Sequence, residues 1–216
     1  MSDDRRSSAN SPLSEAARIE GIWGGEFGNA YVQRNPVDPG LRQSFWQGIA
    51  ERFPVTSILE VGCNLGANLR PLVRVTGDGV RLAGIDINAT ALGALHGAEP
   101  SLRLTRASGR ALPFADGAFD FVFTVGVLIH QPPELLPLVM DEIQRCSRRF
   151  VMCAEYYAPD PVEVPYRGQT RALFKADFGG LYARRHGLQV RETDRLLGPG
   201  WDDVTYWVLE KDPSPR

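Results

Sequence analysis

The sequence predicts an α/β fold, a doubly wound and mostly parallel sheet of seven strands with an antiparallel C-terminal β-hairpin. Short apolar runs alternate with segments of helical periodicity from residue 57 to residue 157, which is typical of parallel sheets. Residues 188–195 and 203–210 are two alternating runs joined by a Gly-Pro-Gly turn. This pair predicts the closing hairpin, because antiparallel edges are common on parallel sheets.

Each run has the residues that its place in the sheet requires. Residues 119–127, FDFVFTVGV, are apolar on both faces, as a central parallel strand should be. Between the runs, apolar residues recur at helical spacing over residues 65–75, 89–97 and 132–149. The expected parallel strands are 57–61, 81–87, 101–107, 119–127 and 149–157.

The composition is that of a single globular domain. The chain has 216 residues, 43% of them hydrophobic and 23% charged, and it contains no internal repeat. We expect a disordered N-terminal tail over residues 1–12 and one domain over residues 13–211. Its expected parts are an N-terminal lid (about 13–52), a cofactor-binding core (53–157), an acceptor-site insertion (158–185) and the C-terminal hairpin (186–211).

Charge and cysteine usage exclude several classes of function. The net charge is −2, with 24 basic and 26 acidic residues, so the basic surface of a nucleic-acid-binding or lipid-binding protein is missing. No apolar run is long enough to span a membrane, and the polar N-terminus does not resemble a secretory signal. We therefore expect a cytoplasmic protein. No metal site is expected, since the three cysteines and three histidines lie at spacings that build none: Cys63, Cys146, Cys153, His96, His130 and His186.

The first strand leads into a glycine-containing loop, Glu60-Val-Gly-Cys-Asn-Leu-Gly66. Gly62 and Gly66 allow a sharp turn and a close approach of a ligand to the backbone. Asp86 ends the second strand, 24 positions after Gly62. In open α/β sheets, a carboxylate at this position is well placed to bind a ribose diol. The loop and Asp86 therefore predict a site for a ribose-bearing cofactor.

The same loop argues against a dinucleotide. The three glycines of a GxGxxG motif are missing, and Glu60 would repel a pyrophosphate but attract an ammonium group. The loop therefore favours a cationic, ribose-bearing cofactor without phosphates. S-adenosylmethionine (SAM) fits that description, and a dinucleotide-dependent oxidoreductase is disfavoured.

Three segments resemble motifs of the class I SAM-dependent methyltransferases, which have a Rossmann-like sheet: ILEVGCNLG, GIDIN and ALPFADGAFDFVFTVGVLIH. The resemblance extends over residues 22–211. Asn64 stands where the family most often has glycine, and Ser108 where many members have an Asp that binds the adenine amino group. Asn tolerates a positive φ, so the turn should survive. The implied cofactor-binding residues are Glu60, Gly62, Cys63, Asn64, Asp86, Ile87, Ser108, Gly109 and Val125.

Further blocks are similar to one subgroup, the pseudaminic acid biosynthesis-associated methylases. They are the segment from Trp23 to Asn35, GVLIH, AEYYAPDPVEVPYRG and LFKADFGG. In such enzymes the N-terminal segment closes over the cofactor. Arg34 is then expected to pair with the methionine carboxylate, because a guanidinium makes two parallel hydrogen bonds to that group. Tyr31 is expected to cover the sulfonium.

Two residues are candidate catalytic groups. His130 follows the fourth strand, and its imidazole could take a proton from an acceptor hydroxyl or ammonium. Glu155 is the single acidic residue in the fifth strand and could orient the acceptor or act as a base. The alternatives are that His130 only packs before the two prolines, and that Glu155 only binds backbone amides of a neighbouring loop.

The expected acceptor site lies mainly after the fifth strand. Arg167 and Lys175 would suit an anionic acceptor such as a carboxylated sugar or a nucleotide sugar, although a solvated charged helix is an equal alternative. The expected acceptor-binding residues are Trp23, Tyr156, Tyr166, Arg167 and Lys175.

We therefore expect a SAM-dependent methyltransferase that transfers the methyl group to an O or N atom of a small molecule and leaves S-adenosylhomocysteine (SAH). One candidate acceptor is a sugar or nonulosonic acid intermediate. A natural-product amine, amino acid or nucleoside is the first alternative. A non-catalytic SAM-binding regulator is the second. The sequence leaves the oligomeric state open.

Overall fold

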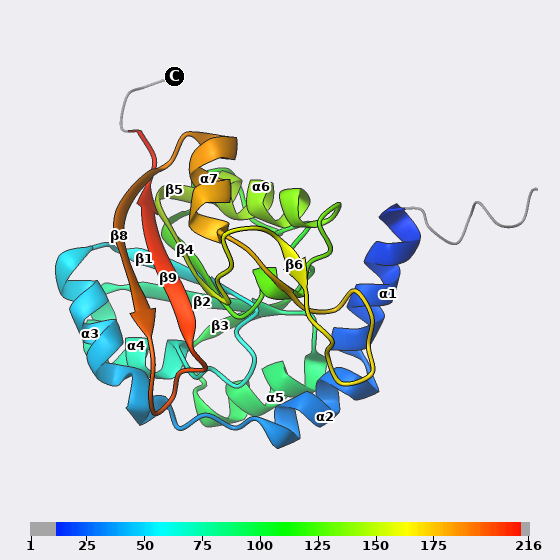
Figure 1. Ribbon diagram of the computed structural model, residues 1–216. Helices are drawn as coiled ribbons and strands as arrows, with labels where there is room; N and C mark the ends of the chain where they lie inside the picture. Colours follow the sequence, from blue (N-terminus) through cyan, green and yellow to red (C-terminus); the bar gives the residue numbers. More distant parts are fainter. Residues whose placement is uncertain (1–11, 213–216) are drawn as a thin grey trace, which may run out of the picture.

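The computed structural model describes residues 12–212, which form one seven-stranded sheet in the order β3-β2-β1-β4-β5-β9-β8 (Figure 1). The first five strands of this order are parallel, and β9 is antiparallel to both of its neighbours. The predicted fold class, including the C-terminal hairpin, is confirmed. The strands are β1 (Ser57–Val61), β2 (Arg81–Asp86), β3 (Arg103–Arg106), β4 (Phe119–Val125), β5 (Ser147–Glu155), β8 (Gln189–Leu196) and β9 (Val204–Glu210).

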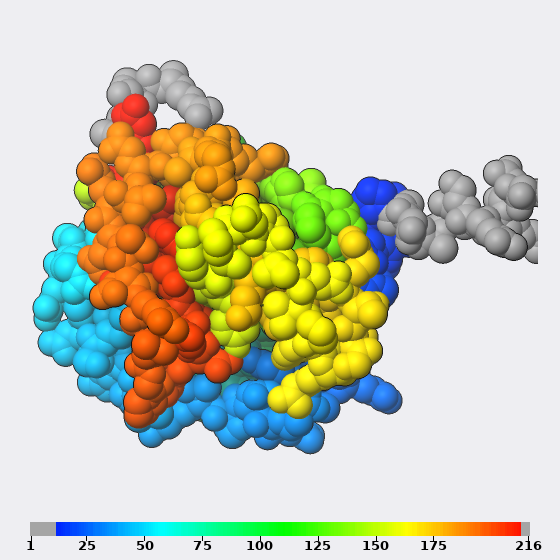
Figure 2. Space-filling view, viewed as in Figure 1, coloured from blue at the N-terminus to red at the C-terminus, as the bar shows by residue number. Residues whose placement is uncertain are grey.

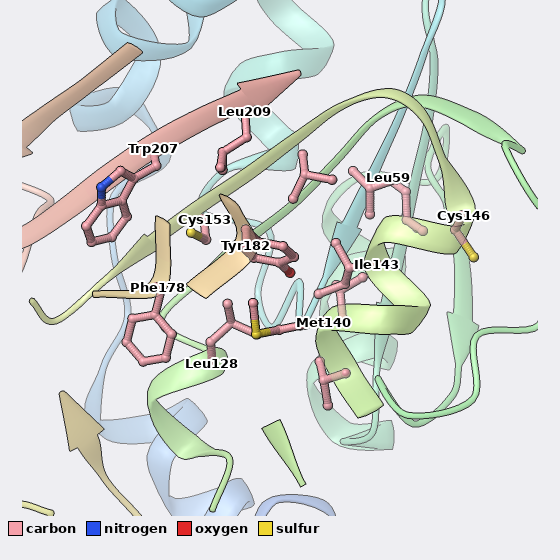
Figure 3. Packing of buried hydrophobic residues seen from close by; sticks show 14 of the residues in the cluster. Leu59, Leu128, Met140, Ile143, Cys146, Cys153, Phe178, Tyr182, Trp207 and Leu209 are labelled. Carbon is pink, nitrogen blue, oxygen red and sulfur yellow. The ribbon is translucent and has the colours of Figure 1, made fainter. Parts of the chain in front are cut away.

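Helices cover both faces of the sheet. One face packs against α6 and α7, whose buried residues include Ile143 and Tyr182 (Figure 3). The other face packs against α3, α4 and α5, with Trp46 and Leu69 in the core. The helices are α1 (Pro12–Gly24), α2 (Glu26–Arg34), α3 (Gln43–Arg52), α4 (Leu69–Thr76), α5 (Ala89–Ala98), α6 (Leu136–Cys146) and α7 (Phe178–His186).

The strand order reverses between β1 and β4, and this reversal locates the site. From β1 the chain continues to β2 and β3 on one side, whereas β4 and β5 lie on the other. The loops that leave the carboxyl ends of β1 and β4 therefore diverge and leave a crevice between them. The first two helices, α1 and α2, lie beside this end of the sheet (Figure 1).

The segment after β5 contains little regular structure before α7. Its two short strands, β6 (Val162–Glu163) and β7 (Phe174–Lys175), pair with each other and not with the main sheet. Residues 158–175 cover the face of the molecule between the C-terminal hairpin and α1 (Figure 2). The charged helix considered for this segment begins only at Phe178.

The structure also describes the cysteines, the groups that could bind a metal, the start of the first helix and the character of the helices. All three cysteines are buried and free, as expected for small hydrophobic side chains. Within residues 12–212, no group of three or more His, Cys, Asp or Glu side chains could hold a metal ion. Residues 1–11 of the expected disordered tail lie outside the described residues, and Pro12 already begins α1. No helix of the described part of the chain is both long and apolar enough to cross a membrane.

Candidate functional site

A cavity of about 170 Å³ lies at the carboxyl ends of the parallel strands. The loops that follow β1, β2, β3 and β4 form its floor, and α1 and α2 form its wall. The position agrees with the crevice that the strand order predicts. The lining residues named as cofactor-binding from the sequence are Tyr31, Gly62, Asn64, Asp86, Ile87, Ser108, Gly109 and Val125. Trp23 and His130, which were named for the acceptor and for catalysis, also line it.

The loop after β1 has the backbone conformation that its sequence requires. Gly62 has φ 79° and Asn64 has φ 45°, so Asn64 adopts the positive φ that the family's glycine would supply. A Cβ atom on Gly62 would lie 2.4 Å from Cγ2 of Val127. The amides of Gly62 and Cys63 both donate to the carbonyl oxygen of Ile85, at 2.8 and 2.9 Å. The loop is therefore held against the end of β2 at the cavity floor.

Asp86 joins this loop to the start of α5. Its Oδ2 accepts a hydrogen bond from the amide of Asn64 at 2.8 Å, and its Oδ1 accepts one from the amide of Asn88 at 2.8 Å. Burial raises the pKa of Asp86, while the two backbone amides lower it. Each carboxylate oxygen keeps further acceptor capacity. Because Asp86 lines the cavity, this capacity is available to the hydroxyl groups of a ligand.

Glu60 lies behind the loop and does not line the cavity. Its Oε1 accepts from Nδ2 of Asn68 at 2.6 Å, and Oδ1 of Asn68 accepts in turn from Arg42 and Trp46. Burial raises the pKa of Glu60 to about 8. Its Oε2 is buried without a hydrogen-bond partner. The structure thus places Glu60 in a buried polar cluster behind the cavity floor.

Two other expected cofactor residues also lie outside the cavity lining. Cys63 is buried in the core against α4, and its Sγ lies near Gly84. Arg34 is exposed at the end of α2, with its guanidinium 5.7 Å from the ring centroid of Phe27. Tyr31, one turn earlier, does line the cavity and contacts Trp23 edge to face at 5.5 Å.

His130 is buried between the lid and the segment after β5. Its Nδ1 lies 2.6 Å from the carbonyl oxygen of Ala172. Because a carbonyl only accepts, this nitrogen carries the proton and Nε2 keeps its lone pair. Burial lowers the pKa of His130 to about 4, so the ring is neutral near pH 7. The ring of Trp23 lies 4.3 Å away, centroid to centroid, and the ring of Tyr166 lies 5.3 Å away.

Glu155 is fully buried and supports the loop that carries His130. Its Oε1 accepts from the hydroxyl of Thr124 and from the amides of Val127 and Leu128, and its Oε2 accepts from the amide of Ile129, all within 3.3 Å. It does not line the cavity. Burial raises its pKa to about 7, against the lowering effect of these bonds. The geometry therefore favours the alternative of a carboxylate that holds a neighbouring loop over the role of a base.

The remaining acceptor candidates surround the cavity without lining it. The hydroxyl of Tyr156 donates to Asp202, and Nζ of Lys175 lies 5.5 Å from the Tyr156 ring. Burial is the main cause that raises the pKa of Tyr156. Arg167 is exposed, with φ 48°. These side chains give the outer surface near Tyr166 a mixed aromatic and cationic character.

Sequence reasoning missed several lining residues. Arg110 forms an ion pair with Glu20 and donates to the carbonyl oxygen of Ala16, so it joins the loop after β3 to α1. Asn88 caps α5 and donates to the carbonyl oxygen of Trp23. An Asn at the start of a helix can be recognised from the sequence as a capping residue. Its contact with α1 cannot be predicted from the sequence. The lining residues that were not named are Ile19, Glu20, Gly28, Val32, Val61, Ile85, Asn88, Ala107, Arg110, Val127, Gln131 and Val139.

Three polar atoms at the cavity are buried and have no hydrogen-bond partner. They are Nε1 of Trp23, Oδ1 of Asn64 and Oε1 of Gln131. One is a donor and two are acceptors. Buried polar groups are rarely left unpaired in folded proteins. Bound ligands that carry both donors and acceptors would satisfy them.

Comparison with known proteins agrees with this geometry. Residues 58–149 match the sequence model of the family described as methyltransferase domain. A sterol 24-C-methyltransferase of Gibberella zeae is 25% identical over 182 residues, which cover 74% of this chain and 46% of that protein. The chain thus spans less than half the length of this curated relative.

Two solved structures are similar over nearly the whole chain. The 1,6-didemethyltoxoflavin-N1-methyltransferase of Burkholderia thailandensis, solved with its substrate and SAH, has a TM-score of 0.69 at 14% identity, covering 97% of this chain and 93% of that one. The magnesium protoporphyrin IX methyltransferase of Synechocystis PCC 6803, solved with SAM, has a TM-score of 0.68 at 13% identity, covering 94% and 100%. The chain therefore has the fold of these methyltransferases, and residues 58–149 carry the sequence pattern of the methyltransferase domain.

Proposed function

We propose that this protein is a SAM-dependent methyltransferase that acts on an O or N atom of a small molecule. The observation that carries the proposal is the pairing of Asp86 with the loop of positive φ at Gly62 and Asn64, at the floor of the cavity. The match of residues 58–149 to the methyltransferase domain and the fold shared with enzymes solved with SAM or SAH support it.

In this proposal, separate groups of residues bind the cofactor and exclude water. SAM supplies an electrophilic methyl group on a sulfonium. Asp86 accepts hydrogen bonds from the ribose hydroxyls, and Ser108 and Gly109 lie beside the adenine. Val125 lines the methionine end. Tyr31 and the rest of the lid exclude water, which keeps the acceptor as the only nucleophile near the methyl group.

His130 acts on the acceptor at one atom. Its Nε2 accepts the O–H or N–H proton of the nucleophile while the positive charge on that nucleophile develops. The bond from Nδ1 to Ala172 fixes the ring orientation and tautomer for this task. A pKa of about 4 makes the imidazole a weak base, so most of the acceleration comes from alignment of the acceptor with the methyl group. Glu155 acts through the loop that carries His130, as a positioning residue.

The acceptor that we propose is a sugar or nonulosonic acid intermediate. Arg167 and Lys175 lie on the segment after β5; Nζ of Lys175 is 5.5 Å from the centroid of the Tyr156 ring, and Arg167 follows Tyr166 in the chain. A cation over an aromatic face and a second cation next to a tyrosine suit an anionic and partly apolar molecule. The likeness of several sequence blocks to the pseudaminic acid subgroup supports the same class. A free amine, an amino acid or a nucleoside is the alternative that the assay must separate.

Asp86→Asn tests the cofactor site. Because the amide keeps the size of the side chain but loses the charge and one acceptor, we expect SAH affinity to fall by about tenfold or more, measured by isothermal titration calorimetry. Asp78→Asn, at an exposed Asp in the turn before β2, is the matched control and should bind SAH like the wild type. Unchanged SAH affinity in Asp86→Asn with an unchanged melting temperature would contradict the ribose assignment.

The acceptor is identified by mass spectrometry of reactions that contain SAM and one of two panels. One panel holds free and nucleotide-activated nonulosonic acids, and the other holds amino acids, nucleosides and small amines. A product one methyl group heavier in the first panel supports the sugar assignment. A product in the second panel alone keeps the enzyme class and overturns the sugar. SAM binding without a product in either panel favours the non-catalytic regulator.

A further inference from the structure

Besides the ribose and loop contacts, the cavity has a polar end that the proposed cofactor site does not use. It is formed by Trp23 on α1, His130 in the 3-10 turn Leu128–His130, and Gln131 next to it. His130 and Gln131 are 8% and 9% exposed, so both are more than nine-tenths buried. Nε1 of Trp23 and Oε1 of Gln131 have no hydrogen-bond partner. A ligand group is therefore needed to pair them.

The amide of Gln131 has a defined orientation. Its Nε2 donates to the carbonyl oxygen of Val127 at 3.5 Å. The opposite orientation would bring two oxygen atoms together, which is unfavourable. Oε1 is therefore the atom left for a ligand, and it can only accept.

His130 presents a second acceptor at this end of the cavity. Its Nδ1 proton is committed to Ala172, which leaves the lone pair of Nε2. The indole ring of Trp23 lies 4.3 Å from the imidazole ring, measured between the ring centroids. The polar atom of the indole, Nε1, is a hydrogen-bond donor. The polar end thus offers one donor and two acceptors, on three side chains that line the same cavity.

This set of atoms selects among chemical groups. A carboxylate or phosphate has acceptors only and would meet two further acceptors at Gln131 and His130. A hydroxyl or a neutral amino group both donates and accepts. Two neighbouring hydroxyls, or a hydroxyl beside an acetamido group, would pair all three protein atoms at once.

We propose that Gln131 and Trp23 are specificity-determining residues that, with His130, bind a hydroxyl-bearing part of the methyl acceptor. The inference rests on the proposed function and sharpens it: the acceptor enters with its neutral polyol side toward this end, and any anionic group points outward to Arg167 and Lys175. Because Trp23 belongs to α1, the acceptor contact is complete only with the lid in place. Gln131 was not singled out by the sequence, since it belongs to no recognisable motif.

The test uses SAH-saturated protein and two probes of similar charge. N-acetylneuraminic acid carries a carboxylate with neighbouring hydroxyl and acetamido groups, and cyclohexanecarboxylate carries the carboxylate alone. We expect the first probe to shift the indole N–H resonance of Trp23 in ¹H–¹⁵N spectra, assigned by its loss in Trp23→Phe. The second probe should leave that resonance in place. Calorimetry of the first probe against Gln131→Leu should give a Kd about tenfold weaker than against the wild type, with unchanged SAH affinity.

Gln131→Leu has a matched control on α2. Gln33→Leu, at an exposed Gln on α2 outside the cavity, should bind both ligands like the wild type. If SAH alone shifts the Trp23 resonance and Gln131→Leu weakens SAH binding, the atoms belong to the cofactor site and the inference is overturned. It is overturned as well if neither N-acetylneuraminic acid nor any member of the two acceptor panels shifts that resonance. Failure of the wild type to bind SAH would instead overturn the proposed function.

Discussion

The two sides of the cavity are built in different ways. On the proposed cofactor side, Gly62, Asn64 and Asp86 come from consecutive strand ends, and their contacts are mainly hydrogen bonds between loop backbones and one carboxylate. On the proposed acceptor side, His130 is held by Ala172, and Trp23 packs against it from α1. Ala172 comes 42 residues after His130 in the chain, and Trp23 comes about a hundred residues before it.

This difference predicts which side tolerates substitutions. A site made of strand ends depends on the sheet, whose registry the whole core enforces. A site made of a lid helix and a long segment depends on few contacts, which can be exchanged without loss of the fold. We therefore expect substitutions on the cofactor side to affect stability and binding together, and those on the acceptor side to affect binding alone.

The largest expected effect is that of Gly62→Ala. A left-handed φ costs a residue with Cβ about 1–2 kcal/mol, and the contact of 2.4 Å with Val127 adds an overpacking cost of about 1–3 kcal/mol. We expect the free energy of unfolding, measured by urea denaturation, to fall by the sum of these two costs. We also expect SAH binding to be lost.

Gly187→Ala separates the two contributions. Gly187, at the end of α7, also has a positive φ, 68°, in the left-handed helical region, but no atom lies within 4 Å of its Cβ position. This variant should lose only about 1–2 kcal/mol and should keep its SAH affinity. Equal losses of stability in both variants would mean that the contact with Val127 does not matter.

The strand ends that form the cavity floor could be predicted from the sequence. They are readable from apolar runs, and Gly62, Asn64 and Asp86 stand at fixed distances from them, so their placement in one crevice follows from the parallel sheet. Glu60, Cys63 and Arg34 were expected at the same site, but none of them lines the cavity. For Glu60, alternation along a strand does not reveal that Asn68 and Arg42 would form a buried polar cluster around it.

The acceptor side was predicted only in part, because its contacts are not local. His130 was found from its place at a strand end, whereas its partner Ala172 has a main-chain oxygen that no sequence pattern marks. Glu155 was expected at the mouth, but an isolated charge in a strand does not show which loop will fold onto it. Gln131 and Arg110 belong to no sequence pattern that marks a binding site. Each lines the cavity only because α1 or the neighbouring turn is packed beside it.

The buried cluster of Glu60 predicts a pH-dependent stability. Burial raises its folded pKa to about 8, above the ordinary value of 4.5. The folded state therefore binds more protons between these two values, and the stabilising contribution is fully present below 4.5 and is lost as the pH rises through 8. We expect the wild type to lose up to about 1.4 kcal/mol per pH unit in that range from this group.

Glu60→Gln removes the titrating group at this position and should reduce the slope of this part of the curve of unfolding free energy against pH, measured by urea denaturation. The slope that remains below pH 7 comes from the buried Glu155, whose pKa is raised to about 7. Glu26→Gln, at an exposed residue of α2, should retain the slope of the wild type. An unchanged slope in Glu60→Gln would show that Glu60 is already ionised in the folded protein, stabilised by Asn68 and Arg42. The buried cluster would then be a charged support of the cofactor side.

The smallest expected effect concerns the ion pair between Arg110 and Glu20, which holds α1 to the cofactor side. The Arg110 side chain is 12% exposed and that of Glu20 35%, so removal of the charge in Glu20→Gln should cost about 1 kcal/mol at most. Since this pair joins the two sides, amide hydrogen exchange should become up to about fivefold faster in α1 while that of β1 and β2 stays unchanged. Arg184→Gln removes an exposed ion pair with Asp177 on α7 and should leave α1 as it is. Faster exchange in both α1 and the sheet after Glu20→Gln would show that the lid and the cofactor side form one cooperative unit, which would contradict the division between them.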